Sequence, residues 1–222
     1  MCAAATTPTL DGYTDLGTMI DERDGKKYAV RKYSDGHCWL AQNLAFGTIS
    51  SNTNYQTYSQ TTALGILGTG LYGVAGSPGG NYEGYLYDWQ AVMQRSDAYD
   101  GKAYSGPTSG VQGICPTGWH IPTSGTNGEI QTLLNTVGSN YISFFFGGNF
   151  CASGSKCIAG SFYGYNGSPV RQGTNFYIWS SNPDASRNTT HSHNLDANAS
   201  NVRPADSSRR YYGCSVRCLA DY

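Results

Sequence analysis

Alternating apolar and polar residues mark two neighbouring stretches near the start of the chain. Residues 27–33 (KYAVRKY) alternate as a half-buried strand does, and residues 37–46 (HCWLAQNLAF) have the apolar content of a return strand around a buried Trp39. The turn residues at 34–36 (SDG) join the two stretches. We therefore predict a β-hairpin, preceded by a lead-in at residues 1–20 that shows no periodicity.

Helical spacing occurs twice in the middle of the chain. Residues 85–93 (YLYDWQAVM) predict a short helix, and residues 129–135 (EIQTLLN) predict a second one that Asn127 caps. Between them, residues 113–123 (GICPTGWHIPT) carry turn residues around a Trp119 that we expect to be buried. The expected buried residues are Leu86, Trp89 and Met93 in the first helix and Ile130, Leu133, Leu134 and Val137 in the second.

Two strand-like runs bracket a long polar stretch in the last quarter of the chain. The runs are residues 175–181 (NFYIWSS) and 211–219 (YYGCSVRCL), and we predict a strand from each. From Ser180 to Tyr222 the sequence contains no Lys, Glu, Gln, Met or Trp, although all five occur freely before it. This gap is typical either of chance in a loop-rich segment or of positions drawn from a restricted set of amino acids.

Composition indicates a loop-rich protein with many β-strands. Charged residues make up 13% of the 222 residues, about half of the ~25% usual for soluble domains, whereas there are 29 Gly and 18 Tyr. The net charge of −1 argues against nucleic acid and anionic membranes as partners. Because the N-terminal hairpin and the C-terminal strands are short, we expect them to share one sheet of a single α+β domain.

The cysteines indicate an oxidising compartment. None of the seven lies in a CxxC pair and there are only four His residues, which argues against a zinc site. Cys151 and Cys157 bracket five small or polar residues that a local disulfide could close. We expect an extracellular or cell-surface protein. No run approaches the ~18–20 apolar residues of a membrane span and no signal peptide is present, so we expect the export or anchor segment to lie outside this sequence.

Five motifs together carry a resemblance to a known family. DERDGKKYAVRKYSDGHCWLAQNL, YLYDWQAVM, GICPTGWHIPT, IWSS and RYYGCSVRC follow one another in this order between residues 15 and 221. This set resembles the Fibrobacter-succinogenes-major-paralogous (FISUMP) domain family of bacterial surface proteins, which is similar to the C-type-lectin-like fold. In one departure from the family pattern, Cys214 stands where an aromatic residue is usual.

The resemblance implies a C-type-lectin-like domain over residues 21–222. It implies small twisted antiparallel sheets, paired N- and C-terminal strands, a helix after GWHIP, and an exposed ligand face within residues 182–212. Some family members are variable proteins of diversity-generating retroelements, in which adenine mutagenesis turns AAC codons into NNC codons. NNC codons cannot encode the five residue types that are absent after residue 179. The implied framework residues are Trp179, Ser180, Ser181, Leu195, Val202, Pro204, Arg210, Gly213, Ser215, Val216, Arg217 and Cys218.

The resemblance further implies that the positions between these framework residues contact a ligand. We expect that ligand to be a protein or a glycan on another cell or a phage, bound by a monomer. Tyr, Asn, Ser, His, Asp and Arg suit such a surface, as they do in antibody loops. The expected contact residues are His191, His193, Asn194, Asp196, Asn198, Asn201, Arg203, Asp206, Ser207, Ser208, Arg209, Tyr211 and Tyr212.

For the cysteines, the family pattern implies disulfides Cys2–Cys38 and Cys115–Cys218 beside the local Cys151–Cys157 bridge. On a continuous final strand, Cys214 and Cys218 would share one face, so that Cys214 could compete for Cys115. We expect Cys214 to be the free thiol. A lipid-anchored Cys2 is the alternative for the N-terminus, but it would leave Cys38 unmatched.

Candidate chemistry other than binding is weak. His191 and His193, with Asp196, could hold a metal, but they occupy positions that look freely variable. Residues 182–184 (NPD) resemble the calcium motif of sugar-binding lectins, yet the other calcium ligands of such a site are missing. No nucleophile elbow is present. We therefore expect no cofactor, metal or catalysis. A diversified receptor is the main hypothesis; a fixed carbohydrate-binding lectin or adhesin and a structural pilus or envelope subunit are the alternatives.

Overall fold

The described residues form an α+β fold, as predicted from the sequence. Antiparallel sheets dominate the described part of the computed structural model, and the two α-helices within that part are short. The described residues are 13–47, 66–67, 86–141, 162–163, 169–170, 175–198 and 200–221.

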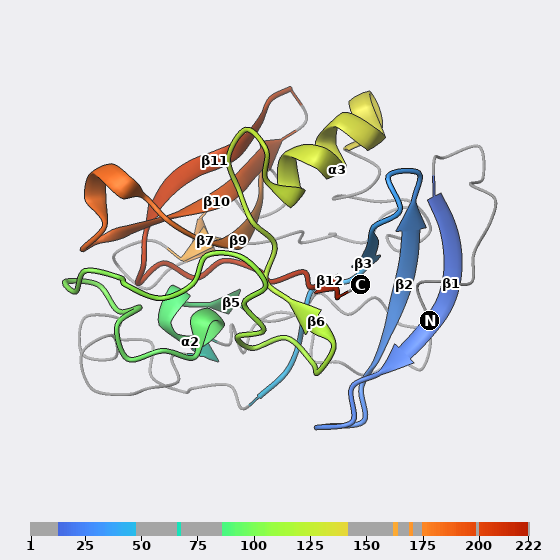
Figure 1. The fold of residues 1–222 in the computed structure, drawn as a ribbon, viewed down its shortest axis with the longest axis horizontal. Helices are drawn as coiled ribbons and strands as arrows, with labels where there is room; N and C mark the ends of the chain where they lie inside the picture. Colours follow the sequence, from blue (N-terminus) through green and yellow to red (C-terminus); the bar gives the residue numbers. More distant parts are fainter. Residues whose placement is uncertain are drawn as a thin grey trace.

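One sheet joins the two ends of the chain. Its order is β1-β2-β3-β12-β6 (Figure 1). The strands are β1 (Tyr13–Ile20), β2 (Lys27–Tyr33), β3 (Cys38–Leu40), β12 (Leu219–Ala220) and β6 (Trp119–His120). The hairpin of β2 and β3 and its shared sheet with the C-terminal strand are therefore confirmed, although the return strand ends at Leu40 rather than continuing to residue 46.

β1 lies in the segment that the sequence placed in a lead-in. Met19 is its only buried residue, so the strand lacks the apolar alternation that marks a core-facing strand. It is held by its backbone pairing to β2, from Tyr13↔Tyr33 to Ile20↔Lys27. A shift of register between Asp15 and Thr18 surrounds Gly17, whose φ of 83° favours glycine. An edge strand of this kind leaves almost no hydrophobic signal in the sequence.

The second sheet is built from the last quarter of the chain in the order β11-β10-β9. β9 (Asn175–Pro183) confirms the predicted strand at 175–181. The other two strands, β10 (His191–Asn198) and β11 (Val202–Arg209), lie in the polar stretch. The prediction of a strand at 211–219 is wrong. That segment makes only isolated bridges before β12 begins. Hydrogen bonds engage the buried side chains of Ser192 and Asp196 on β10, so the burial of these residues leaves no apolar alternation in the sequence.

The two helices differ from prediction at their starts. α2 (Trp89–Met93) begins after Asp88, whose carboxylate accepts a hydrogen bond from the Ala91 N–H, and Leu86 belongs to a strand before it. Leu86, Trp89 and Met93 are buried as predicted.

α3 (Glu129–Val137) is capped from a distance. Its N-cap residue is Gly128, so the prediction of Asn127 as the cap is wrong. The hydroxyl of Thr123 accepts a hydrogen bond from the Glu129 N–H in its place. The predicted apolar face of the helix is buried, as expected, whereas Trp119 is only half-buried.

The remaining elements are short. They are the strands β4 (Ile66–Leu67), β5 (Leu86–Tyr87), β7 (Phe162–Tyr163) and β8 (Pro169–Val170) and the 3-10 helices η2 (Gly138–Asn140) and η4 (Ala185–Arg187).

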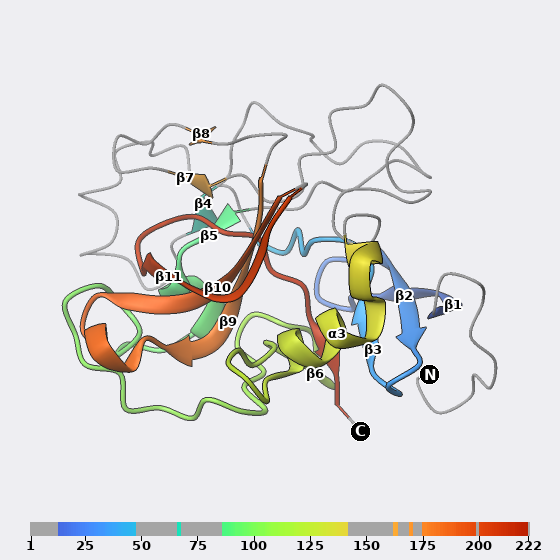
Figure 2. The ribbon, with the colours of Figure 1, turned by 90° about the horizontal axis from the view of Figure 1, so that it is seen from above.

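α3 lies between the two sheets and packs on both (Figures 1 and 2). Its apolar face contacts Trp39 of β3 and Phe176 of β9 in one core cluster. A second cluster surrounds Trp89 and Trp179, whose indole N–H groups donate to backbone carbonyls of Ser180 and Tyr87. In the described part of the chain, no helix is long and apolar enough to cross a membrane.

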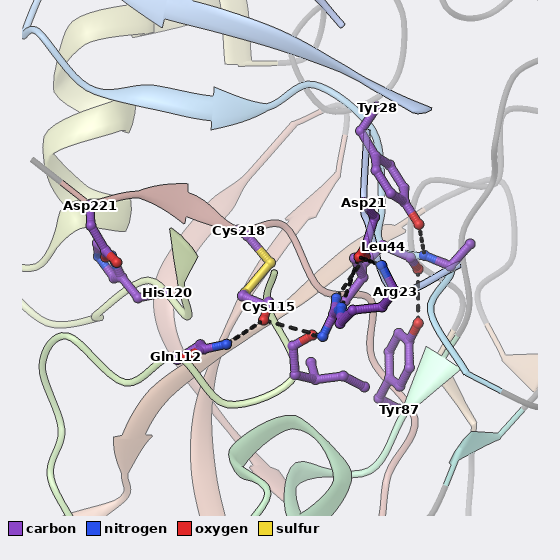
Figure 3. Close-up of a disulfide and its surroundings, with 12 residues drawn as sticks. Asp21, Arg23, Tyr28, Leu44, Tyr87, Gln112, Cys115, His120, Cys218 and Asp221 are labelled. Atoms are coloured by element: carbon purple, nitrogen blue, oxygen red, sulfur yellow. Dashed lines mark hydrogen bonds and ion pairs between the residues drawn. A yellow bond between two sulfur atoms is a disulfide. The ribbon is translucent and has the colours of Figure 1, made fainter. Parts of the chain in front are cut away.

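The predicted disulfide Cys115–Cys218 is present and ties the loop before β6 to the segment entering β12 (Figure 3). Cys38 is also disulfide-bonded, and its predicted partner Cys2 lies outside the described residues. The predicted Cys151–Cys157 bridge lies outside them as well. Cys214 is a buried free thiol. Burial raises its pKa well above the ordinary value, so it stays protonated.

Candidate binding surface

The β10–β11 hairpin has two chemically different faces. Successive side chains of a strand point to opposite sides. The pairs His191↔Arg209 and His193↔Ser207 define one side, which we call the outer face, and all four side chains on it are half-buried. The opposite side, the inner face, carries fully buried residues. The inner-face residues are Ser192, Asn194, Asp196 and Ser208.

Three of the expected contact residues therefore cannot meet a ligand in this structure. Asn194, Asp196 and Ser208 are at most 5% exposed. Asn194 directly follows His193, and Ser208 directly follows Ser207, and consecutive strand residues point to opposite faces. Asp196 lies two residues after Asn194 and so points to the same side as Asn194. The sequence interpretation treated adjacent positions as one surface because it took the stretch for strands and loops of unknown register.

Asp196 shows what the inner face does. Its carboxylate accepts a hydrogen bond of 2.8 Å from the Asn175 side-chain amide and another from the Arg203 guanidinium. These contacts join all three strands, because Asn175 lies on β9 and Arg203 on β11. A buried carboxylate with two donors is stable, and it would become costly if either donor were lost.

Arg210 fixes the end of the hairpin. It is 1% exposed, and its Nε donates to the Ser192 hydroxyl at 3.0 Å. Its terminal nitrogens donate to the backbone carbonyls of Lys102 at 2.7 Å and Asn188 at 2.6 Å. The guanidinium also lies over the Trp89 ring at 4.5 Å. One side chain thus holds β10, the loop at 99–102 and the turn before β10 in fixed positions.

Asp184 fixes the loop beside the outer face. Its carboxylate accepts hydrogen bonds from the Ser186 hydroxyl at 2.6 Å and the Ser207 hydroxyl at 2.5 Å. The Arg187 guanidinium donates to it at 3.1 Å. Burial would raise the pKa of Asp184, but these donors outweigh burial and hold the pKa well below its usual range. The carboxylate is therefore charged at neutral pH and clamps η4 onto β11.

The two outer-face histidines are neutral at pH 7. Burial lowers the pKa of both rings below the ordinary value, and at His191 the charges of Arg187 and Arg209 lower it further. Nδ1 of His191 lies 2.7 Å from the Thr190 hydroxyl. Nδ1 of His193 lies 3.2 Å from the Ser124 hydroxyl. In both rings Nε2 has no partner among the described residues, which leaves it free to bond a ligand.

The remaining expected contact residues lie at the two ends of the hairpin. Tyr211 and Tyr212 follow β11 next to Arg209, are half-buried and stack edge to face at 5.0 Å. At the other end, Asn201 and Arg203 are exposed. Asp206, between the two ends, is half-buried and lies 3.5 Å from the Arg203 guanidinium.

Asn198 at this far end has a structural task. Its side-chain oxygen accepts hydrogen bonds from the Ser200 and Asn201 N–H groups and so closes the turn between β10 and β11. The two ends are about 20 Å apart at ~3.3 Å per residue, so the expected residues do not form one compact site.

Four residues of this surface were not among the expected contacts. Ser124 and Asn182 border His193, and the Ser124 N–H donates to the Asn182 side chain at 2.7 Å. Arg187 and Asp100 border His191 and Arg209. The neighbouring Asp184 left a signal in the sequence, since an Asp two residues before a Ser is a common capping pattern. The others reach the surface through contacts between distant segments.

The oxygen atoms of the calcium-like motif are engaged within the protein. Asn182 accepts from the Ser124 N–H, and Asp184 accepts from Ser186, Ser207 and Arg187. Within the described ranges, no three His, Cys, Asp or Glu side chains come together as a metal-binding group.

The chain matches no family model, and no similar protein was found among curated proteins or solved structures. The family resemblance drawn from the five motifs therefore stays a prediction.

Proposed function

We propose that this chain is a non-enzymatic, surface-displayed binding protein with a C-type-lectin-like fold. The outer face and Tyr211 form its ligand-binding surface, and diversification by a retroelement is the source of the surface side chains. The observation that carries the proposal is the separation of roles in the β10–β11 hairpin. Buried polar side chains fix the backbone, and Ser207 joins them through Asp184, whereas the half-buried side chains of His191 and Arg209 contribute little to that network.

This separation is what a variable binding surface requires. Arg210 and Asp184 anchor the hairpin from inside the protein, so replacing His191 or Arg209 leaves the backbone bonds in place. A surface residue of this kind usually changes stability by less than about 0.5 kcal/mol when it is replaced. Tyr and Arg also suit contact with a protein, since both are enriched among residues that dominate binding energy.

The test compares three proteins on arrays of purified proteins and glycans, with and without EDTA. The first is the wild-type chain, and the second carries His191→Ala, His193→Ala and Arg209→Ala. The third is a control with Asp15→Ala, Thr18→Ala and Ile20→Ala on β1, which are exposed on the far sheet. We expect the wild-type chain to be retained on the arrays with or without EDTA. The β1 variant should be retained as well, whereas the outer-face variant should not.

Two other results would favour the alternative functions. A fixed lectin would be indicated if the chain is retained on sugars and if EDTA, but not the outer-face changes, abolishes that retention. Self-assembly that depends on β1, with indifference to the outer face, would indicate a structural pilus or envelope subunit.

The diversification part has its own test in the surrounding DNA. A reverse transcriptase gene and a near-identical, adenine-rich template repeat are expected beside the gene. Sister genes should then differ more at His191, His193 and Arg209 than at Ser192 and Asp196, whose side chains are buried. A complete locus without either element would remove diversification from the proposal and leave the binding surface in place.

A further inference from the structure

The ion pairs around the outer face are arranged asymmetrically. In the pair Arg187–Asp184 the guanidinium is 53% exposed and the carboxylate 8%. In the pair Arg209–Asp100 the corresponding values are 42% and 19%. In both pairs the positive group reaches the solvent and the negative group lies inside, so a partner approaching the surface meets mainly cationic groups.

Both arginines retain unused hydrogen-bond donors. A guanidinium carries five N–H groups. Arg187 uses its Nε for Asp184, and its terminal nitrogens have no acceptor among the described residues. Arg209 lies 3.7 Å from the Asp100 carboxylate, which is an ion pair but too long for a hydrogen bond. Burial raises the pKa of Asp100 above its ordinary value, although the charges of Arg209 and Arg210 lower it in part.

The two arginines flank one histidine. His191 pairs with Arg209 across the strands, and the charges of both Arg187 and Arg209 act on its ring. Asp184 and Arg210 are the other charged groups that act on it. Arg187, in the turn that leads into His191, and Arg209, opposite it, therefore both lie near this ring, and the Arg209 guanidinium is 5.8 Å from the Tyr211 ring.

We propose that this cluster of Arg187, His191 and Arg209 binds an acidic side chain of a protein partner. A carboxylate can accept paired hydrogen bonds from a guanidinium, and such charge-assisted bonds are among the strongest in proteins. The inference rests on the proposed function, because it names the chemistry of the partner for the same surface. The neighbouring Tyr211 favours a protein over a sulfated glycan, since Tyr and Arg together are typical of protein interfaces.

The experiment uses a Glu-rich peptide and the same peptide with Gln at every Glu position. Binding to the full chain is measured by NMR chemical shifts at low and at physiological salt. We expect the Glu peptide to shift the His191 ring signals and to raise the pKa of His191, because an anion offsets the two arginine charges. We expect the Gln peptide to bind at least about tenfold more weakly, and salt to weaken the Glu peptide.

Two variants locate the site. The double variant Arg187→Gln/Arg209→Gln should weaken binding of the Glu peptide by about tenfold or more and remove its salt dependence. Arg203→Gln is the control, because Arg203 is also a half-exposed arginine paired with a buried carboxylate, at the far end of the same strand. It should leave binding within about twofold of wild type, and its loss of the Asp196 hydrogen bond should appear only as a lower unfolding temperature, which is measured for each variant.

The inference is overturned if the two peptides bind equally, if neither binds, or if Arg203→Gln weakens binding as much as the double variant. Tighter binding of heparin than of the Glu peptide, with the same dependence on Arg187 and Arg209, would replace the protein partner by a sulfated glycan. If these arginines do not matter but the outer-face changes still abolish retention on the arrays, only the charge chemistry fails. If the outer-face changes also leave retention on the arrays unchanged, the charge chemistry and the proposed function both fail.

Discussion

The two main sheets bury their central strands by different means. In the five-stranded sheet, β2 and β3 bury Tyr28, Val30 and Trp39, each at most 1% exposed. In the three-stranded sheet, β10 buries Ser192 and Asn194 just as completely. The first sheet follows the ordinary rule that apolar side chains face the core. The second shows that a strand without that pattern can be equally buried when its polar side chains form hydrogen bonds, as Ser192 does with Arg210 and the Asn194 amide N–H does with the Leu195 carbonyl.

This difference has a consequence for substitutions. Apolar packing tolerates exchanges of similar volume, whereas a buried polar network loses a bond with every partner removed. Substitutions of buried residues should therefore lower the stability of the three-stranded sheet more than that of the five-stranded sheet. Substitutions of outward-facing residues should lower it less. The predictions below test that contrast, beginning with the largest effect expected.

The Cys115–Cys218 disulfide is a covalent support of the five-stranded sheet. Cys115 and Cys218 are 103 residues apart in the sequence. Replacing both by Ser should lower the free energy of unfolding by about 4 kcal/mol. Without the bond the unfolded chain is no longer closed into a long loop, so its conformational entropy rises. Urea unfolding of the double variant and the wild type measures the difference. A loss below about 1 kcal/mol would contradict the idea that this bond stabilises the sheet against unfolding.

Arg210 is the equivalent support of the three-stranded sheet. Arg210→Met keeps the apolar stem but leaves the Lys102 and Asn188 carbonyls and the Ser192 hydroxyl without their donor. We expect a loss of about 3 kcal/mol in urea unfolding. Its neighbour Arg209 provides the control, and Arg209→Met should cost less than about 0.5 kcal/mol. Equal losses in the two variants would remove the distinction between an inner and an outer face.

Sequence reasoning succeeded where burial depends on apolar residues. The hairpin of β2 and β3, the apolar face of α3 and strand β9 all follow from periodicity. It failed where burial depends on hydrogen bonds. β10 and β11 read as a polar loop, because nothing local in the sequence shows that Asp196 meets Asn175 or that Ser192 meets Arg210.

The candidate surface was predicted in part. Its location in the last quarter came from the family resemblance, which also singled out His191 and Arg209. Asn194, Asp196 and Ser208 were included wrongly, because the register of a hairpin decides which residues face out and the register was unknown. Asp100 was missed, because its ion pair with Arg209 joins distant segments and has no sequence signature. Arg187 was missed although its partner Asp184 is only three residues away, because nothing in the sequence shows that this pair borders His191.

Two aspartates give a finer test of the two faces. Asp196 and Asp206 both lie within ion-pair distance of Arg203, but Asp196 is 2% exposed and Asp206 is half-buried. Asp196→Ala should cost about 2 kcal/mol, because the Asn175 amide loses its partner inside the protein. Asp206→Ala should cost less than about 0.5 kcal/mol, as surface ion pairs usually do. Thermal and urea unfolding of both variants decide the matter, and an inverted order would contradict the assignment of faces.

The smallest predicted effect is a difference in pH dependence between two histidines. His120, on β6, lies between the carboxylates of Asp221 at 2.6 Å and Glu129 at 2.9 Å (Figure 3 shows its contact with Asp221). Burial alone lowers the pKa of His120, but these two hydrogen bonds outweigh it and raise the pKa above the ordinary value. For His193 the balance is opposite, because burial lowers the pKa and no carboxylate bonds the ring among the described residues.

The two shifts predict slopes of opposite sign. A raised pKa means that the folded state holds the proton more tightly, so the stability from His120 is fully present below about pH 6.5 and is lost as the pH rises through its raised pKa. A lowered pKa means that His193 costs stability as the pH falls below about 6.5. His120→Gln should therefore flatten the decline of unfolding free energy on the alkaline side. His193→Gln should flatten the decline on the acidic side. Urea unfolding from pH 5 to pH 9 measures both, and a His120→Gln variant that kept the alkaline decline would show that some other group causes it. Such a result would leave the five-stranded sheet resting on apolar packing and its disulfide, with the buried ionic contact at its edge contributing nothing measurable.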